Sequence, residues 1–139
     1  MTHKKASGYE EIGHTADLSL KVWATTLEDL FINALSGMYS MIDVSVSADD
    51  QLELQELYFD EMDHESLLVS FLSECNFKLQ NEKEYLDVHE IIVGTKSLMV
   101  KFSKFRINKF VKEIKAVTYH NLKIKNSSKG YSVVIVFDV

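Results

Sequence analysis

Apolar and polar residues alternate first between residues 17 and 24. Leu18, Leu20 and Val22 recur with a period of two, which predicts a strand over about 17–24. Thr26 then has the character of an N-cap, and the residues after it carry apolar side chains at helical spacing up to residue 42. These apolar positions are Leu27, Leu30, Phe31, Ala34, Leu35, Met38, Met41 and Ile42. The pattern therefore predicts a strand followed by an amphipathic helix over about 26–42.

A second helix is predicted over about 63–82, with Asp63 as its N-cap. Its apolar stripe is Leu67, Leu68, Phe71, Leu72, Cys75 and Leu79. Between the two helices, residues 44–50 predict a loop and residues 51–59 predict a strand, with Leu52 and Leu54 on one face.

The last third of the chain reads mainly as strands, while 107–113 has no clear pattern. The predicted strands are 85–94, 97–105, 114–125 and 131–139, with turns at 94–96 and 126–130. Because strands gather late, the prediction is an α+β fold. We expect one domain over 1–139, with residues 1–8 flexible and a mixed or antiparallel sheet of six or seven strands. Both helices would cover one face of that sheet.

The last strand carries the first candidate chemistry. Residues 133–137 are apolar on both faces, which is typical of a strand in the centre of a sheet. The strand ends on Asp138 and Val139, so a side-chain carboxylate and the main-chain carboxylate would lie together. Adjacent negative charges repel each other and resist desolvation, and a lysine or a hard cation would offset this cost. Asp17, at the end of another predicted strand, would add a third carboxylate.

Calcium or magnesium would suit such a set of oxygen ligands. The alternative is that the chain end and both aspartates are simply solvated. His14 precedes the first predicted strand, but a histidine there more often bonds backbone groups, and hard cations seldom bind imidazole. The residues alone therefore leave both interpretations open.

Charge is distributed unevenly in this chain of 139 residues, whose net charge is −6. Residues 1–93 carry −14 and residues 94–139 carry +8. Either the two halves attract each other across the fold, or the basic half forms a surface for an acidic partner or RNA. We favour the first, because Lys101, Lys104 and Lys109 mostly alternate with apolar residues. No aromatic motif of the RNP type supports sequence-specific RNA reading.

A cytoplasmic location is expected. The single cysteine, Cys75, cannot form an internal disulfide, and a reduced compartment is the simplest interpretation. No apolar run approaches the roughly 20 residues that cross a membrane. The N-terminal residues have no apolar core of a signal peptide.

Four segments resemble the archease family. They are HTADLSL near the start, LFINALSGMYSMI on the first predicted helix, KAVTYHNLKI late in the chain and VVIVFDV at its end. They occur in the order of the family and span residues 9–139. The resemblance implies a sheet with two helices.

The resemblance also implies a function. Archeases are small cytoplasmic proteins that assist the RtcB-type RNA ligase in tRNA splicing. They promote guanylylation of the ligase with GTP and manganese and allow repeated turnover, without being the ligase. The metal site of the family, described with calcium, would correspond to Asp17, Asp138 and the carboxylate of Val139. RNA contact would be indirect or weak, and no membrane is implied.

Further residues gain candidate roles from the resemblance. In the predicted strand 114–125, alternation sets Thr118 and His120 on one face and Lys115 on the other, which from the residues alone is a polar sheet face. Glu74 lies off the apolar stripe of its helix and is expected at the surface. By resemblance, Lys115, His120, Glu74 and His14 would lie beside the metal ligands or contact the partner.

Two other function classes stay open. The first is a metal-dependent hydrolase or nuclease that uses Asp17, Asp138 and His14, although the chain shows no nucleophile–base pair and no glycine-rich phosphate loop. The second is a non-catalytic interaction or chaperone-like module, in which the carboxylates are only structural.

Overall fold

The fold was analysed in a computed structural model, which describes residues 6–13 and 17–139, with the backbone alone at 48–52. Two helices, α1 (Leu27–Ile42) and α2 (His64–Glu82), accompany two antiparallel sheets. The first sheet has the order β1-β2-β8-β6, with β7 paired to β8, and the second has the order β3-β5-β4. The strands are β1 (Gly8–Gly13), β2 (Leu18–Ala24), β3 (Val44–Asp60), β4 (Glu84–Val93), β5 (Ser97–Phe110), β6 (Ala116–Val117), β7 (Lys125–Ser127) and β8 (Gly130–Asp138). The predicted α+β class with antiparallel strands is confirmed.

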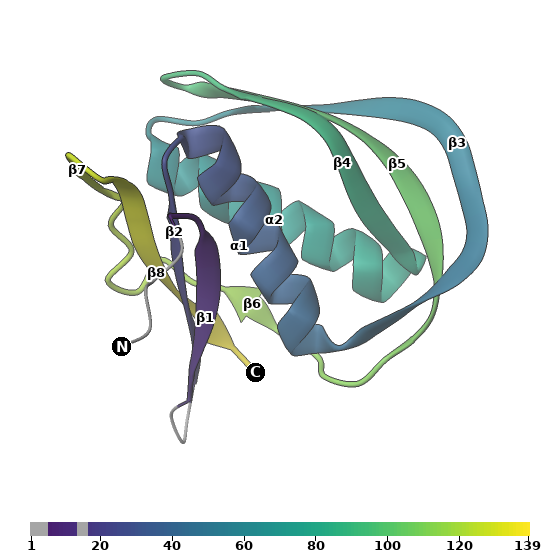
Figure 1. Cartoon of the computed structure of the whole chain (residues 1–139). Helices are drawn as coiled ribbons and strands as arrows, with labels where there is room; N and C mark the ends of the chain where they lie inside the picture. The colour runs from purple at the N-terminus through teal and green to yellow at the C-terminus, as the bar shows by residue number, and fades with distance from the viewer. Residues whose placement is uncertain (1–5, 14–16) are drawn as a thin grey trace.

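Both helices lie between the two sheets (Figure 1). Helix α1 packs on β1 and β2 of the first sheet and on β4 of the second, and α2 contacts β6 as well as β3 and β4. One sheet with helices on one face was expected, so the division into two sheets is a difference from the prediction. Its physical reason is visible in α1, where nine of 16 residues are buried, including Gly37 and Tyr39. A helix with that much buried surface needs partners on two sides.

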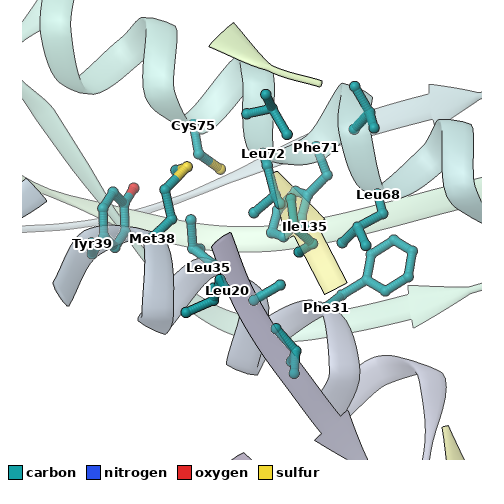
Figure 2. Close-up of a cluster of buried hydrophobic side chains, with 14 of the residues drawn as sticks. Leu20, Phe31, Leu35, Met38, Tyr39, Leu68, Phe71, Leu72, Cys75 and Ile135 are labelled. Carbon is teal, nitrogen blue, oxygen red and sulfur yellow. The ribbon is translucent and has the colours of Figure 1, made fainter. Parts of the chain in front are cut away.

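The helix ends follow the local sequence closely. The Asp29 N–H donates to Thr26 Oγ1 at 3.1 Å, and the Ser66 N–H donates to Asp63 Oδ1 at 2.8 Å, so both predicted N-caps are confirmed. The predicted stripe of α2 is fully buried, from Leu67 to Leu79. Figure 2 shows side chains of both helices gathered around Leu20 and Ile135 of the first sheet.

The cap of α2 yields a prediction for pH dependence. The Ser66 N–H holds the pKa of the Asp63 carboxyl below its usual range. Because the pKa is lower in the folded state, the ionised carboxyl of Asp63 contributes to the free energy of unfolding. This contribution is complete above the unfolded pKa of about 4 and is lost as the pH falls through the folded pKa. We expect Asp63→Asn, which keeps a capping oxygen, to lose less stability than wild type on acidification. Melting temperatures between neutral pH and about pH 3 check this; parallel curves would contradict it.

Two strands depart from the sequence prediction. Residues 44–50, predicted as a loop, belong to β3, which pairs with β5 through several register shifts that act as bulges. Strand β1 was not predicted, because most of its residues are exposed and it carries no clear alternation. It pairs along its whole length with β2, from Gly8 opposite Trp23 to Gly13 opposite Leu18.

The predicted strand 114–125 is wrong for most of its length. Ala116 and Val117 form β6 and pair with β8, residues 118–124 belong to no strand, and Lys125 begins the separate strand β7, which also pairs with β8. A turn at residues 120–121 interrupts the segment, with Asn121 at φ 51° in the left-handed region. Asparagine tolerates that conformation better than most residues do, which explains the break.

Strand β8 lies inside the first sheet, as predicted. It pairs with β2 on one side and with β6 and β7 on the other. Its inward side chains, Val133, Ile135 and Phe137, are buried, whereas Val134 on the outer face is 40% exposed. The outer face of this sheet is therefore open. No helix in the described part of the chain is long and apolar enough to span a membrane.

Candidate functional site

The pairing of β2 with β8 brings two predicted ligands together. The last paired residues are Leu18 and Phe137, and one further step of the same register sets Asp17 opposite Asp138. Residues opposite each other in an antiparallel pair point to the same face. Leu18 and Phe137 pack toward the helices, so the two carboxylates belong to the opposite, outer face. Both aspartates are exposed.

The end of β8 is held from its other side as well. Ala116 pairs with Asp138, and the Lys115 N–H donates to the Asp138 carbonyl oxygen at 2.8 Å. Figure 1 shows the C-terminus leaving β8 beside β6. The position of Asp138 is therefore defined by neighbours on both edges, and Val139 follows it directly.

The electrostatics of this pair fit a hard cation. Like charges directly opposite each other on paired strands destabilise a sheet, and nothing in the described residues forms an ion pair with Asp17 or Asp138 within 4.0 Å. The two side-chain carboxylates offer as many as four oxygens, and the predicted carboxylate of Val139 would bring the number to six; calcium takes six to eight, with water as a common addition. The donor set consists of oxygens only, which favours calcium or magnesium over softer metals.

Side chains alone do not complete the site. Among residues 6–13 and 17–139, no three His, Cys, Asp or Glu side chains are grouped to hold a metal ion. The third predicted donor, the carboxylate of Val139, belongs to the main chain. His14 lies outside the described residues, so its predicted role is untested.

Of the other predicted residues, Lys115 adjoins Asp138, whereas Glu74 and His120 do not form a group of metal ligands with the two aspartates in the described part of the chain. Thr118 Oγ1 donates to the Val136 carbonyl at 2.9 Å and accepts the His120 N–H at 3.2 Å. His120 thus lies in a turn, and the prediction that it shares a strand face with Thr118 is wrong. Glu74 is half-buried on α2, 3.8 Å from the Lys78 Nζ. Lys115 is exposed and reaches the site through its backbone.

Sequence reasoning missed two side-chain amides that support the segment beside the end of β8. The Asn76 and Gln80 side chains both donate to the Ile114 carbonyl, at 2.9 and 2.7 Å, and Gln80 also donates to Asn76 Oδ1. They line a cavity of about 400 Å³ between α2 and residues 113–117. These bonds fix the segment that carries β6, and so the end of β8. The available signal was two amides four residues apart beside the apolar stripe.

Comparisons with known proteins identify the family of this chain. Residues 9–139 match the model of the archease protein family. The chain belongs to the archease family. An archease from Methanosarcina barkeri is 31% identical over 94% of this chain and 95% of its own length. An archease from Saccharolobus solfataricus is 28% identical over 94% of this chain and 98% of its own length.

Solved structures carry the same archease fold. The solution structure of Methanobacterium thermoautotrophicum protein 1598 aligns with a TM-score of 0.69 at 21% identity, over 95% of this chain and 99% of the other. A Thermotoga maritima protein, described as an archease and possible chaperone, aligns with a TM-score of 0.68 at 21% identity, over all of both chains. At this identity the two structures support the fold alone. In this chain the register of β2 and β8 sets Asp17 opposite Asp138, the two aspartates predicted from the sequence.

Proposed function

We propose that this archease activates an RtcB-type RNA ligase in tRNA splicing, by promoting guanylylation of the ligase and its repeated turnover. We further propose that Asp17, Asp138 and the carboxylate of Val139 hold calcium or another hard divalent cation. The observation that carries the proposal is the register of β2 and β8, which sets the two aspartates opposite each other. Family membership supports the choice of partner.

An activator can act here without catalytic residues of its own. Bound at the carboxylates, a divalent cation would supply positive charge near the triphosphate that reacts in guanylylation. The protein's own part would be to hold that charge at the exposed ends of β2 and β8, where a partner reaches it. Alternatively, binding would favour the conformation of the ligase that is competent for guanylylation. In both routes this protein is not itself catalytic. The location that goes with the proposal is the cytoplasm, where the buried Cys75 would stay reduced.

A chaperone-like interaction module is the second candidate function. The observation that favours it is an apolar row on the outer face of the second sheet, where Tyr58 is opposite Met99 and Met99 is opposite Ile92. Tyr58 is 68% exposed and Ile92 is 52% exposed. Exposed apolar side chains in neighbouring positions are typical of surfaces that contact other proteins.

The deciding experiment measures transfer of labelled GMP to a purified RtcB-type ligase, with GTP and manganese, in the presence and absence of this protein. Faster labelling with the protein is the expected result. No effect on the ligase from the same source would overturn the activator proposal and favour the interaction module. Incubation of the purified protein alone with RNA tests the hydrolase alternative, and metal-dependent cleavage would support that alternative.

A change that alters no side chain tests the third ligand. Adding a short Gly-Ser segment after Val139 converts its carboxylate into a peptide carbonyl, so we expect weaker calcium binding. The control is the same segment added ahead of Met1. Calorimetric titration with calcium measures both, and equal affinities of the two extended proteins would show that the carboxylate of Val139 is not a ligand.

A further inference from the structure

The last residue of the chain is the least supported part of the proposed cation site. Asp17 directly precedes β2 and Asp138 is the last residue of β8, whereas Val139 follows after the strand has ended. Terminal residues fray unless other elements hold them. A mobile carboxylate must be ordered when the cation binds, and that ordering weakens the affinity. The affinity of the site therefore depends on what holds the backbone of Asp138.

Strand β8 has neighbours on both sides near its end, but they do not reach equally far. Of the pairs described, the last one with β2 joins Leu18 and Phe137. On the other side, Ala116 pairs with Asp138, and the Lys115 N–H donates to the Asp138 carbonyl oxygen at 2.8 Å. The segment at the start of β6 thus contacts the backbone of Asp138 directly.

Strand β6 needs support from outside the sheet. It consists of Ala116 and Val117 alone, which is shorter than the usual strand of about 3–10 residues. The Ile114 side chain just ahead of it is fully buried, which fixes how deep the segment lies. Apolar burial has no direction, however, so it does not fix the register of β6 along β8. Hydrogen bonds do have the required direction.

Helix α2 supplies these directional bonds. Asn76 and Gln80 lie about one turn apart, and their side-chain amides donate to the Ile114 carbonyl at 2.9 and 2.7 Å. Gln80 Nε2 also donates to Asn76 Oδ1 at 2.7 Å. A carbonyl oxygen has two lone pairs and an amide nitrogen has two hydrogens, so both groups are fully used. The two side-chain amides and the Ile114 carbonyl are here named the amide clamp.

Asn76 occupies a position where an apolar residue would be expected. It is only 8% exposed, and Cys75 and Leu79 beside it on α2 are fully buried. A buried amide costs free energy unless it is hydrogen-bonded, and a leucine of similar volume would avoid that cost. Buried hydrogen-bonded networks select one arrangement of the groups that they join. Packing alone therefore does not account for Asn76, whereas a role in fixing the segment ahead of β6 does.

We propose that the amide clamp positions Asp138 and Val139 for cation binding, without supplying a ligand itself. The path runs from α2 through residues 114–115 to the carbonyl of Asp138 (Figure 1). Asn76 and Gln80 are thus positioning residues that control the affinity of the site. The inference rests on the cation site proposed above.

Gln80→Met tests the amide clamp, because it removes two of the three hydrogen bonds and keeps a good helix former of similar length. Calcium affinity, measured by calorimetric titration of the full chain, should fall about tenfold, the lower end of the losses typical of residues behind a metal ligand. Hydrogen exchange of the Lys115 amide, measured by NMR without calcium, should become faster. Adding Asn76→Leu removes the third bond and should enlarge both changes.

Two controls separate positioning from general stability. Ser70→Ala removes a different side-chain bond of α2, the one to Glu61 at 2.9 Å. Asn81→Ala removes an amide that borders the same cavity but donates to the Phe77 carbonyl of its own helix. Both should bind calcium within about twofold of wild type, since a modest loss of stability does not change the affinity of the folded state. Exchange of the Lys115 amide should also stay unchanged in both.

The Gly-Ser extension after Val139 shows whether the amide clamp acts through the end of the chain. Gln80→Met should lose less affinity in the extended protein than in the natural one, because the carboxylate that it positions is already absent. Equal losses in the two proteins would overturn the positioning of Val139.

The results also distinguish failure of this inference from failure of the cation site. Wild type that binds no calcium would overturn both. Calcium binding by wild type with unchanged affinity in Gln80→Met would overturn the amide clamp and leave the cation site standing. Equal losses of affinity in Gln80→Met and Ser70→Ala would also overturn the positioning role, since the effect would then follow stability alone.

Discussion

Asp17→Ala is expected to abolish calcium binding and activation of the ligase while the protein stays folded. Asp17 is one of three proposed ligands. Its removal should lower calcium affinity by more than the roughly 10–100-fold that is lost when a residue hydrogen-bonded to a metal ligand is changed. Asp17 is exposed at the end of β2 and lies outside the core, so its loss should change stability by no more than about 0.5 kcal/mol.

The measurement combines calcium titration, ligase guanylylation and thermal unfolding of the same variant. Asp60→Ala is the matched control, because Asp60 is also an exposed carboxylate at a strand end but lies in the second sheet, where it is opposite Ser97. A variant that binds no calcium yet activates the ligase normally would separate the metal from activation and favour conformational stabilisation. Normal calcium binding by Asp17→Ala would remove this residue from the site.

Phe71→Ala is expected to destabilise the fold by about 3–5 kcal/mol. Phe71 is fully buried on α2, with its ring 6.1 Å from that of Phe31 on α1 and 6.3 Å from that of Phe59 on β3. It therefore joins the two helices to the second sheet. Truncation leaves a cavity that close-packed neighbours fill only in part. The loss of folding free energy therefore includes the missing contacts of the ring as well as the free energy of transferring the ring from water to the core.

Urea unfolding of the whole chain measures this change in the free energy of unfolding. Phe77→Ala is the control, since Phe77 occupies the same helix but is 52% exposed, and we expect a loss within about 0.5 kcal/mol. Similar losses for the two variants would mean that Phe71 is not the packing centre between the helices and the second sheet.

Local signals in the sequence determined the helices and the character of the last strand. Caps and apolar periodicity act over three or four residues, so Thr26 and Asp63 could be identified without knowledge of the fold. The apolar character of residues 133–137 likewise predicted a strand between two neighbours, and β8 has them. The segments around Asp17 and Asp138 identified the family, but their juxtaposition needed the pairing of strands from opposite ends of the chain.

Only the tertiary structure decided how the strands are shared between two sheets and which lysines form ion pairs. The partner of a strand depends on contacts between residues distant in sequence. Strand β1 forms by pairing with β2, and β3 extends through residues predicted as a loop because it pairs there with β5. Alternating lysines look the same in the sequence wherever they occur. Lys101 finds glutamates on both neighbouring strands, whereas Lys125 faces the open side of the first sheet, because charge pairing depends on the register of neighbouring strands.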